Sequence, residues 1–269
     1  MQRLLALDLD GTLLRSDGTL GGRTRVALQE ATQLGWVVFP VTARPSRNAV
    51  ALALEEDWPE IACSNGAVTH RSDGEVLQIV PFHVPEVRAF VETARAALPG
   101  ITFGAEWGEY MTAEQAYDEL RGGGNPIEVG RHRPVNDVLL DLKEAKPPLK
   151  LMARHPHFNG PNLVTLLQQG TTELSITAST MSFAEITAAG VNKVAAVKAA
   201  CQRHQISQAQ VVAFGDMPID APLLAWVGHG VAVANSRPDV LVVADEVTAS
   251  NDQEGVALVL ERLLSFCLP

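Results

Sequence analysis

Two carboxylates lie two residues apart near the N-terminus, where a short apolar run ends in a glycine turn. Residues 7–14 read Leu-Asp-Leu-Asp-Gly-Thr-Leu-Leu, and the apolar residues 4–7 are typical of a buried strand. Because strand side chains alternate between faces, we expect Asp8 and Asp10 to point to the same side of a sheet. Open α/β sheets bind ligands at the carboxyl ends of their strands. The pair therefore predicts a site that holds a hard cation and leaves one oxygen free for nucleophilic attack.

Further short motifs follow this octet along the chain. Residues 41–44 (Val-Thr-Ala-Arg) close a second apolar run, residues 190–193 (Gly-Val-Asn-Lys) lead into a predicted helix, and residues 215–220 (Gly-Asp-Met-Pro-Ile-Asp) follow another apolar run. Together with the octet, these segments resemble the four motifs of the haloacid dehalogenase-like (HAD) superfamily, in the same order. Residues 64–67 (Ser-Asn-Gly-Ala) and 250–256 (Ser-Asn-Asp-Gln-Glu-Gly-Val) resemble two more signatures, those of its Cof-type branch.

The resemblance implies a role for each motif. It implies that Asp8 attacks phosphorus and becomes an aspartyl phosphate, while Asp10 exchanges protons with the leaving oxygen and then with water. It implies phosphate and substrate binding by Thr42, Ala43, Arg44, Asn65 and Lys193. It implies a Mg²⁺ site formed by Asp8, Asp10, Asp216 and Asp220, with Asp10 contributing its main-chain carbonyl and Asp220 acting from the first or second shell of ligands.

These roles favour a magnesium-dependent phosphatase of small phosphorylated metabolites, with sugar phosphates as the leading class. The carboxylate of Asp10 favours phosphate esters, because relatives that cleave carbon–halogen or carbon–phosphorus bonds generally lack it. Two alternatives stay open: a phosphomutase or phosphotransferase of the same superfamily, and a catalytically weak ligand-binding or regulatory module. The second alternative depends on Ile219, which stands where the branch usually carries Asn.

The length of the chain and its pattern of expected strands and helices indicate two domains. With 269 residues, it is long for a single hydrophobic core. Apolar runs alternate with helical stretches as in a parallel sheet. We expect strands at 4–8, 36–41, 60–64, 210–214 and 231–233, a hairpin at 68–79, and helices at 22–34, 46–56, 86–98, 192–204, 218–226, 237–242 and 253–266.

Between these stretches, residues 82–183 carry none of the motifs and have the length of an independent small domain. The resemblance implies that they are an α/β cap, inserted into a HAD-like, doubly wound parallel-sheet α/β core made of residues 1–81 and 184–269. Within the insert, residues 131–133 (Arg-His-Arg) form a basic run that we interpret as solvated.

The composition of the chain limits the kinds of molecule that it is expected to bind. The formal net charge of −10 opposes extended contact with nucleic acid, whose binding needs basic side chains to replace counterions. No apolar run is long enough to span a membrane, and no signal-length segment precedes the first strand. Three cysteines without metal-ligand spacing suit a reducing compartment. We therefore expect a cytoplasmic monomer or small homo-oligomer that binds a small phosphorylated metabolite.

Overall fold

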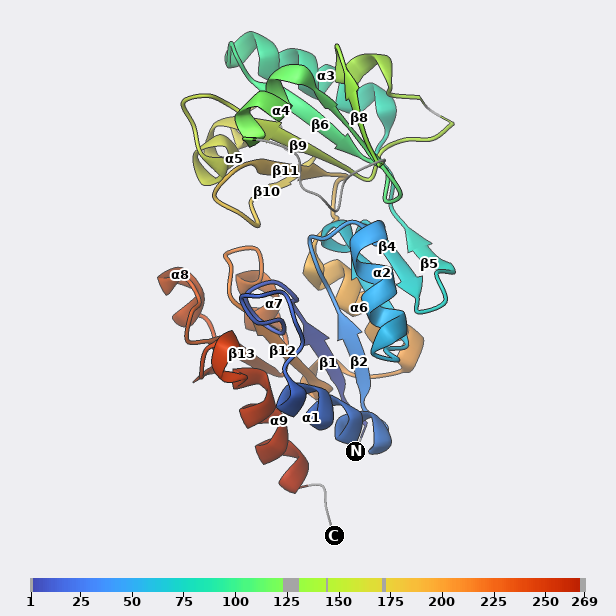
Figure 1. Ribbon diagram of the computed structural model, residues 1–269, viewed down its shortest axis with the longest axis vertical. Helices are drawn as coiled ribbons and strands as arrows, with labels where there is room; N and C mark the ends of the chain where they lie inside the picture. The colour runs from blue at the N-terminus through green and yellow to red at the C-terminus, as the bar shows by residue number, and fades with distance from the viewer. Residues whose placement is uncertain (1, 123–130, 144, 171–172, 267–269) are drawn as a thin grey trace.

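The computed structural model describes residues 2–122, 131–143, 145–170 and 173–266. Its strands form separate sheets, and Figure 1 shows them in two bodies stacked along the long axis of the molecule. One body contains both termini and a parallel sheet, and the other contains the middle of the chain. The predicted mixed α/β class with a parallel-sheet core is confirmed.

The parallel sheet has the strand order β14-β13-β12-β1-β2, and all its ladders are parallel. Strand β1, which pairs with β12 and β2, is buried on both faces, which is why its sequence is continuously apolar instead of alternating. The sheet places the ends of β12, β1 and β2 next to one another. The strands are β1 (Leu4–Leu7), β2 (Val37–Pro40), β12 (Val211–Gly215), β13 (His229–Val233) and β14 (Glu246–Thr248).

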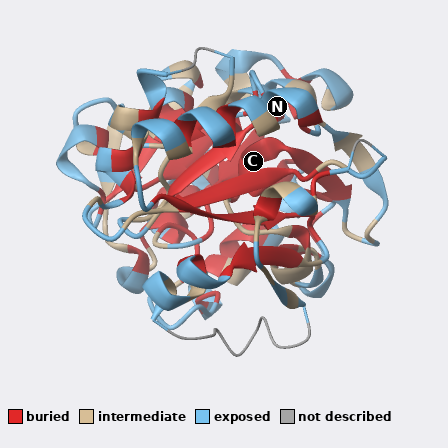
Figure 2. Ribbon diagram, turned by 90° about the horizontal axis from the view of Figure 1, so that it is seen from above, coloured by how far each residue is buried: buried red, intermediate tan, exposed pale blue. Residues whose placement is uncertain are grey.

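Helices cover both faces of this sheet. Leu5 and Leu7 of β1 belong to the hydrophobic cluster that includes buried residues of α1 and α9, whereas Leu4 and Ala6 belong to the cluster of α6 and α7. The sheet is therefore doubly wound, as predicted. Figure 2, in a view from above, shows buried strands in the interior of the molecule and helices with exposed outer faces around them. The helices are α1 (Gly22–Gln33), α2 (Ser46–Glu55), α6 (Lys193–His204), α7 (Ala221–Trp226), α8 (Pro238–Leu241) and α9 (Gly255–Ser265).

A small antiparallel sheet adjoins the parallel one. It consists of β3 (Glu60–Cys63), β4 (Val68–Arg71) and β5 (Val76–Ile79), so the predicted hairpin is confirmed. The strand predicted at 60–64 exists, but it pairs with β4 instead of lengthening the parallel sheet. Its parallel contact is confined to the bridge between Val41 and Ala62, because the chain turns directly after Cys63 and returns along it.

The second body is built on a six-stranded sheet with the order β10-β11-β9-β6-β7-β8, antiparallel except for the β7–β8 pair. This sheet extends to Thr187, beyond the boundary expected at residue 183, because β11 pairs with β9 and β10. Helix α3 packs on one face through Val87, Phe90 and Val91. The elements are β6 (Thr102–Glu106), β7 (Met111–Glu114), β8 (His132–Val135), β9 (Lys150–Arg154), β10 (Ser175–Thr177), β11 (Ala184–Thr187), α3 (Val84–Ala97), α4 (Gln115–Arg121) and α5 (Gly160–Gln168).

In the described part of the chain, no helix combines the length and apolar character needed to cross a membrane. The cytoplasmic location expected from the sequence stays a prediction.

A carboxylate from the C-terminal part of the chain caps helix α1. Gly21, at the N-cap position, has no side chain to accept a hydrogen bond from the helix. Glu254 replaces it: its Oε2 accepts hydrogen bonds from the main-chain nitrogen of Thr24 (2.8 Å) and from the Thr24 hydroxyl (3.0 Å). Its Oε1 accepts a hydrogen bond from Arg15 (2.5 Å). This contact joins α1, α9 and the loop that follows Asp10.

We expect Gly21→Ala to destabilise the protein by about 1 kcal/mol, the typical effect of losing a helix cap. A methyl group at position 21 would collide with the Glu254 carboxylate, which its hydrogen bonds hold in place. Urea unfolding measures the change. Gly22→Ala is the matched control, since a methyl group there meets open space, and its stability should be unchanged or higher. Equal midpoints for the two variants would contradict the capping role.

Candidate active site

A cavity of about 270 Å³ lies where the core faces the second sheet. Asp8 follows β1, Thr42 follows β2, and Asp216 follows β12. The ends of these three strands are neighbours because β1 pairs with both β2 and β12. The opposite wall comes from β9, β11 and α4 of the second body. The sequence prediction of polar residues gathered at the carboxyl edge of a parallel sheet therefore holds for the backbone arrangement.

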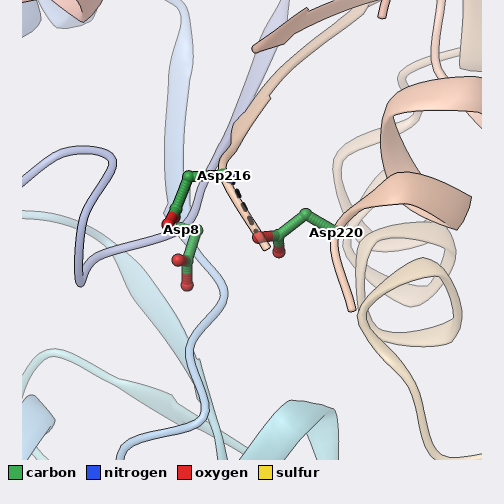
Figure 3. Close-up of side chains that lie close together, drawn as sticks. All are labelled: Asp8, Asp216 and Asp220. Carbon is green, nitrogen blue, oxygen red and sulfur yellow. Dashed lines mark hydrogen bonds between the residues drawn. The ribbon is translucent and has the colours of Figure 1, made fainter. Parts of the chain in front are cut away.

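Three buried carboxylates meet beside this cavity. Asp8, Asp216 and Asp220 each offer a carboxylate oxygen, and these atoms lie within 4.8 Å of one another. Figure 3 shows Asp8 and Asp216 side by side at the ends of neighbouring strands, with Asp220 reaching toward them from the start of α7. The side chain of Asp10 is not part of this cluster, and the predicted role of its main-chain carbonyl at the metal stays a prediction.

Lys193 connects two of the three carboxylates. Its Nζ donates hydrogen bonds to Oδ1 of Asp8 and to Oδ1 of Asp220, both at 2.6 Å, and only 2% of its side chain is exposed. Asn192 caps α6 by accepting a hydrogen bond from the main-chain nitrogen of Ala195 (2.8 Å), which starts the helix at Lys193. Burial alone lowers the pKa of Lys193, but Asp220 and Asp8 outweigh it and raise that pKa above its ordinary value. The lysine therefore stays charged.

Asp220 holds the loop together. Its Oδ2 accepts hydrogen bonds from the main-chain nitrogens of Asp216 (3.2 Å) and Met217 (3.0 Å), and its side chain is completely buried. The main-chain nitrogen of Asp220 donates to the Met217 carbonyl (2.7 Å). This turn delays α7 to Ala221, so the helix predicted from residue 218 begins three residues later. Because both oxygens of Asp220 already accept hydrogen bonds, its position favours an indirect role at a metal site.

Asp8 and Asp216 are the carboxylates with acceptor capacity to spare. Oδ1 of Asp216 accepts a hydrogen bond from the Thr12 hydroxyl (2.6 Å), and Oδ1 of Asp8 accepts the one from Lys193. Gly11 lies against Asp216 with φ +80°, and a Cβ there would lie 2.7 Å from Oδ2. Burial raises the pKa of Asp216 to about 6 and raises that of Asp8 well above its ordinary value.

This donor set fits a hard divalent cation. Three buried carboxylates share one ammonium group, which leaves excess negative charge in a site of low dielectric. Carboxylate oxygens are the ligands that Mg²⁺ and Ca²⁺ prefer. The residues present are therefore compatible with the predicted metal.

Asp10 lies at the mouth of the cavity. Its side chain is 59% exposed and accepts two hydrogen bonds from Arg44, one from Nε to Oδ2 (2.7 Å) and one from Nη2 to Oδ1 (2.5 Å). Asp8 and Asp10 both line the cavity, as the alternation of strand side chains predicts. Arg44, which the sequence assigned to the substrate, orients the Asp10 carboxylate through a forked pair of hydrogen bonds.

The remaining predicted residues lie around the Asp8 end of the cavity. Thr42, Ala43 and Lys193 line its wall, and the Thr42 hydroxyl accepts a hydrogen bond from the main-chain nitrogen of Arg44 (3.1 Å). Asn65 is buried and does not line the wall. Its main-chain nitrogen donates to the Thr42 carbonyl (2.9 Å), so it supports the loop, and its contact with a substrate stays a prediction. Ile219 is half-buried and lines the cavity.

Sequence reasoning missed the ion pairs of the opposite wall. Lys150 donates hydrogen bonds from Nζ to the Ala43 carbonyl (2.8 Å) and to Oε1 of Glu185 (2.5 Å), and both charged side chains are buried. Nη1 of Arg47 donates to Oε1 of Glu106 (2.5 Å), again in a buried pair. A lysine at the start of an apolar strand was the available signal for Lys150. The partners come from distant strands, which no local pattern indicates.

Comparisons with known proteins find similarity over nearly the whole chain. Residues 5–260 match the family model described as haloacid dehalogenase-like hydrolase. The chain is 26% identical to the putative phosphatase YxeH of Bacillus subtilis, over 98% of this chain and 99% of that protein. It is also 26% identical to the 5-amino-6-(5-phospho-D-ribitylamino)uracil phosphatase YitU of Bacillus subtilis, over 97% of each chain. Among solved structures, the subclass IIB sugar phosphatase BT4131 superposes with a TM-score of 0.82 at 20% identity, over 97% of this chain and 98% of that one.

The buried pair of Lys150 and Glu185 leads to a prediction about acid stability. Burial raises the pKa of Glu185, but Lys150 and further hydrogen bonds hold it below its ordinary value. The pair therefore stabilises the fold above about pH 4.5, and this contribution is lost as the pH falls through the lowered pKa. Lys150→Met leaves the carboxylate buried without its charge partner, and we expect a loss of about 3–5 kcal/mol at neutral pH.

In that variant, burial without the lysine raises the pKa of Glu185, so protonation relieves part of the penalty. The deficit in unfolding free energy, measured with urea, should therefore be smaller at pH 5 than at pH 7.5. The double variant Lys150→Met with Glu185→Gln controls for lost packing and should recover part of the stability. A deficit of the same size at both pH values would exclude the charge explanation.

Proposed function

Because the chain belongs to the haloacid dehalogenase-like hydrolase family, we propose that it is a magnesium-dependent phosphatase acting on small phosphorylated metabolites, with sugar phosphates as the leading class. The observation that carries this proposal is the contact of Lys193 with Asp8 beside a cluster of buried carboxylates. The names of the relatives support phosphate esters as substrates, and the sugar phosphatase with the same fold supports the leading class.

In the proposed reaction, a carboxylate oxygen of Asp8 forms a bond to phosphorus while the bond from phosphorus to the leaving oxygen breaks. Asp10 gives its proton to that leaving oxygen. A water molecule then gives a proton to Asp10, and its oxygen bonds to phosphorus as the bond to Asp8 breaks. Arg44 holds Asp10 at the cavity mouth through two hydrogen bonds, and one of these bonds opens so that an Asp10 oxygen carries the proton in each transfer. The products are a free alcohol and phosphate, so atoms and charges balance.

Positive charge supports both steps. Lys193 holds one oxygen of Asp8 and lines the cavity, where its ammonium group can attract phosphoryl oxygens together with the hydroxyl of Thr42. Asp8, Asp216 and the main-chain carbonyl of Asp10 would hold the magnesium ion, with Asp220 in support. When bound, the ion supplies positive charge for the phosphoryl oxygens and offsets the buried carboxylates.

We assign the second body to a cap that excludes water and selects the leaving group, with a core made of residues 1–81 and 184–269. Its sheet supplies most of the cavity wall opposite Asp8, which supports this role. The pairing of β11 with β9 supports counting residues 184–187 with the sheet of the proposed cap.

Replacing the proposed nucleophile tests the mechanism. Asp8→Asn preserves the shape of the side chain but removes the charge needed for attack, so kcat for phosphate release should fall at least about 10³-fold, or roughly 4 kcal/mol in the barrier. Inorganic phosphate released from a panel of phosphorylated metabolites measures it. Asp239→Asn, an exposed carboxylate on α8, is the control and should retain full activity.

Product analysis in the same assay separates the alternatives. Transfer of the phosphoryl group to a second hydroxyl without free phosphate would indicate a mutase or phosphotransferase. Binding of metabolites without turnover by the wild-type protein would indicate the regulatory module that Ile219 favours. Activity of Asp8→Asn above about a tenth of wild type would rule out the aspartyl-phosphate route.

Metal binding is tested without reference to activity. A cation that binds only the folded state increases the free energy of unfolding, by about 2.7 kcal/mol at a hundredfold excess over Kd. The melting temperature rises as a result. We expect Mg²⁺ to raise the melting temperature of chelator-treated protein, and Asp216→Asn to lose most of this rise. Asp239→Asn should keep the full response. A melting temperature unchanged by Mg²⁺ in the wild-type protein would contradict the assigned metal site.

A further inference from the structure

The far wall of the cavity presents one face of β9. Alternate residues of this strand, Lys150, Met152 and Arg154, line the cavity, whereas Leu151 and Ala153 are buried in the hydrophobic core on the other side. Lys150 reaches the Ala43 carbonyl, next to the predicted phosphate-binding Thr42. At about 3.3 Å per residue, Arg154 begins about 13 Å further along the strand. The cavity wall therefore runs from the phosphate end to Arg154.

Aromatic rings hold the guanidinium group of Arg154 in place. The carbon Cζ lies 5.1 Å from the ring centre of Tyr117 on α4 and 5.2 Å from that of Phe183, and all three residues line the cavity. Such cation–π contacts orient the group without neutralising its charge. Its Nη1 donates to the Ser182 carbonyl (3.3 Å), and its Nε is buried and has no hydrogen-bond partner among the described residues. The group is thus positioned and still has donors to offer.

Arg121, the last residue of α4, lines the same end of the cavity. Its hydrogen bond to a side chain goes from Nη1 to the sulfur of Met111 (3.9 Å), a weak acceptor. Within the described ranges, no carboxylate forms a salt bridge with Arg121 or with Arg154. Among the residues that the structure describes, these two guanidinium groups at one cavity end therefore have no carboxylate partner.

The other cations of this cavity are all paired. Arg44 pairs with Asp10, Arg47 with Glu106, Lys150 with Glu185, and Lys193 with Asp8. The excess positive charge of the lining therefore comes from Arg121 and Arg154, in a chain whose formal net charge is −10. A guanidinium group without a carboxylate partner keeps its charge and planar donors available to an anion. A ligand anion at this end would supply that partner.

We propose that the substrate carries a second anionic group, a carboxylate or a second phosphate, which Arg121 and Arg154 bind at the end remote from the transferred phosphoryl group. This inference rests on the proposed phosphatase function and makes its substrate class narrower. Guanidinium groups suit both anions because their planar donors match two oxygens at once. A skeleton of a few carbon atoms joins the two anionic ends.

The test compares substrates that differ in the remote group alone. Glucose 6-phosphate has a neutral remote end, 6-phosphogluconate has a carboxylate there, and glucose 1,6-bisphosphate has a phosphate. We expect kcat/KM for at least one doubly anionic substrate to exceed that for glucose 6-phosphate by about ten- to a hundredfold, the range for a hydrogen bond to a charged group. The preferred member of the pair distinguishes carboxylate from phosphate. Equal or better use of glucose 6-phosphate would overturn the inference.

Variants connect the preference to the two arginines. Arg154→Met and Arg121→Met keep length and lose charge, so each should raise KM for the doubly anionic substrate about tenfold or more and leave glucose 6-phosphate unchanged. Arg133→Met is the matched control, because this arginine of β8 is exposed and does not line the cavity. Equal losses on both kinds of substrate would show that the arginines act through the fold, and would overturn the assignment.

Binding separates failure of this inference from failure of the proposed function. If no substrate releases phosphate, the phosphatase proposal fails. Calorimetry with the Asp8→Asn protein then compares the Kd of glucose 6-phosphate with that of its doubly anionic analogues. Tighter binding of an analogue that disappears in Arg154→Met supports the second anion site, and indistinguishable Kd values refute it.

Discussion

The bonds of Lys193 to Asp8 and Asp220 are the interaction on which the site depends. They join three segments distant in sequence: the end of β1, the start of α6 and the loop after β12. The ammonium group keeps buried carboxylates close together at a position where they would otherwise repel one another. Asp220 in turn fixes the loop of Asp216, because its carboxylate accepts hydrogen bonds from two main-chain nitrogens of that loop. A compact charged centre therefore exists before any ligand arrives, and it still has negative charge to share with a cation.

The second body supplies the cavity wall that faces this charged centre. Lys150 contacts the loop after β2 directly, so the sheet of the second body and the phosphate end of the cavity are joined by a hydrogen bond. Buried pairs of opposite charge make up the nearer wall, and guanidinium groups that pair with no carboxylate of the described ranges make up the remote one. The charge of the lining therefore changes along the cavity. Carboxylates lie at one end, ion pairs lie in the middle, and positively charged side chains lie at the other end. Such grading suits a ligand with anionic groups at both ends.

Much of the core was predictable from local patterns. The strands at 4–8, 36–41 and 210–214 and the helix at 192–204 are present with small shifts, because each is marked by a continuous apolar run or by a cap such as Asn192. The pairing of β3 with β4 and the extension of the second sheet through β11 were not predicted, since strand partners are chosen across long sequence separations. The basic run at 131–133 was conspicuous in sequence but lies outside the cavity wall, whereas the isolated Arg154 is part of it.

The sequence by itself determined the α/β class, the order of the motifs and the pair of aspartates at a strand end, because these depend on period, composition and turn residues within short windows. The tertiary structure decided which carboxylates cluster, that Asp10 pairs with Arg44, that Asn65 supports a loop, and which cations of the cavity pair with a carboxylate. Those outcomes depend on distances between side chains from different strands and helices. Strand order and the packing of the two bodies set these distances, and no short stretch of sequence encodes them.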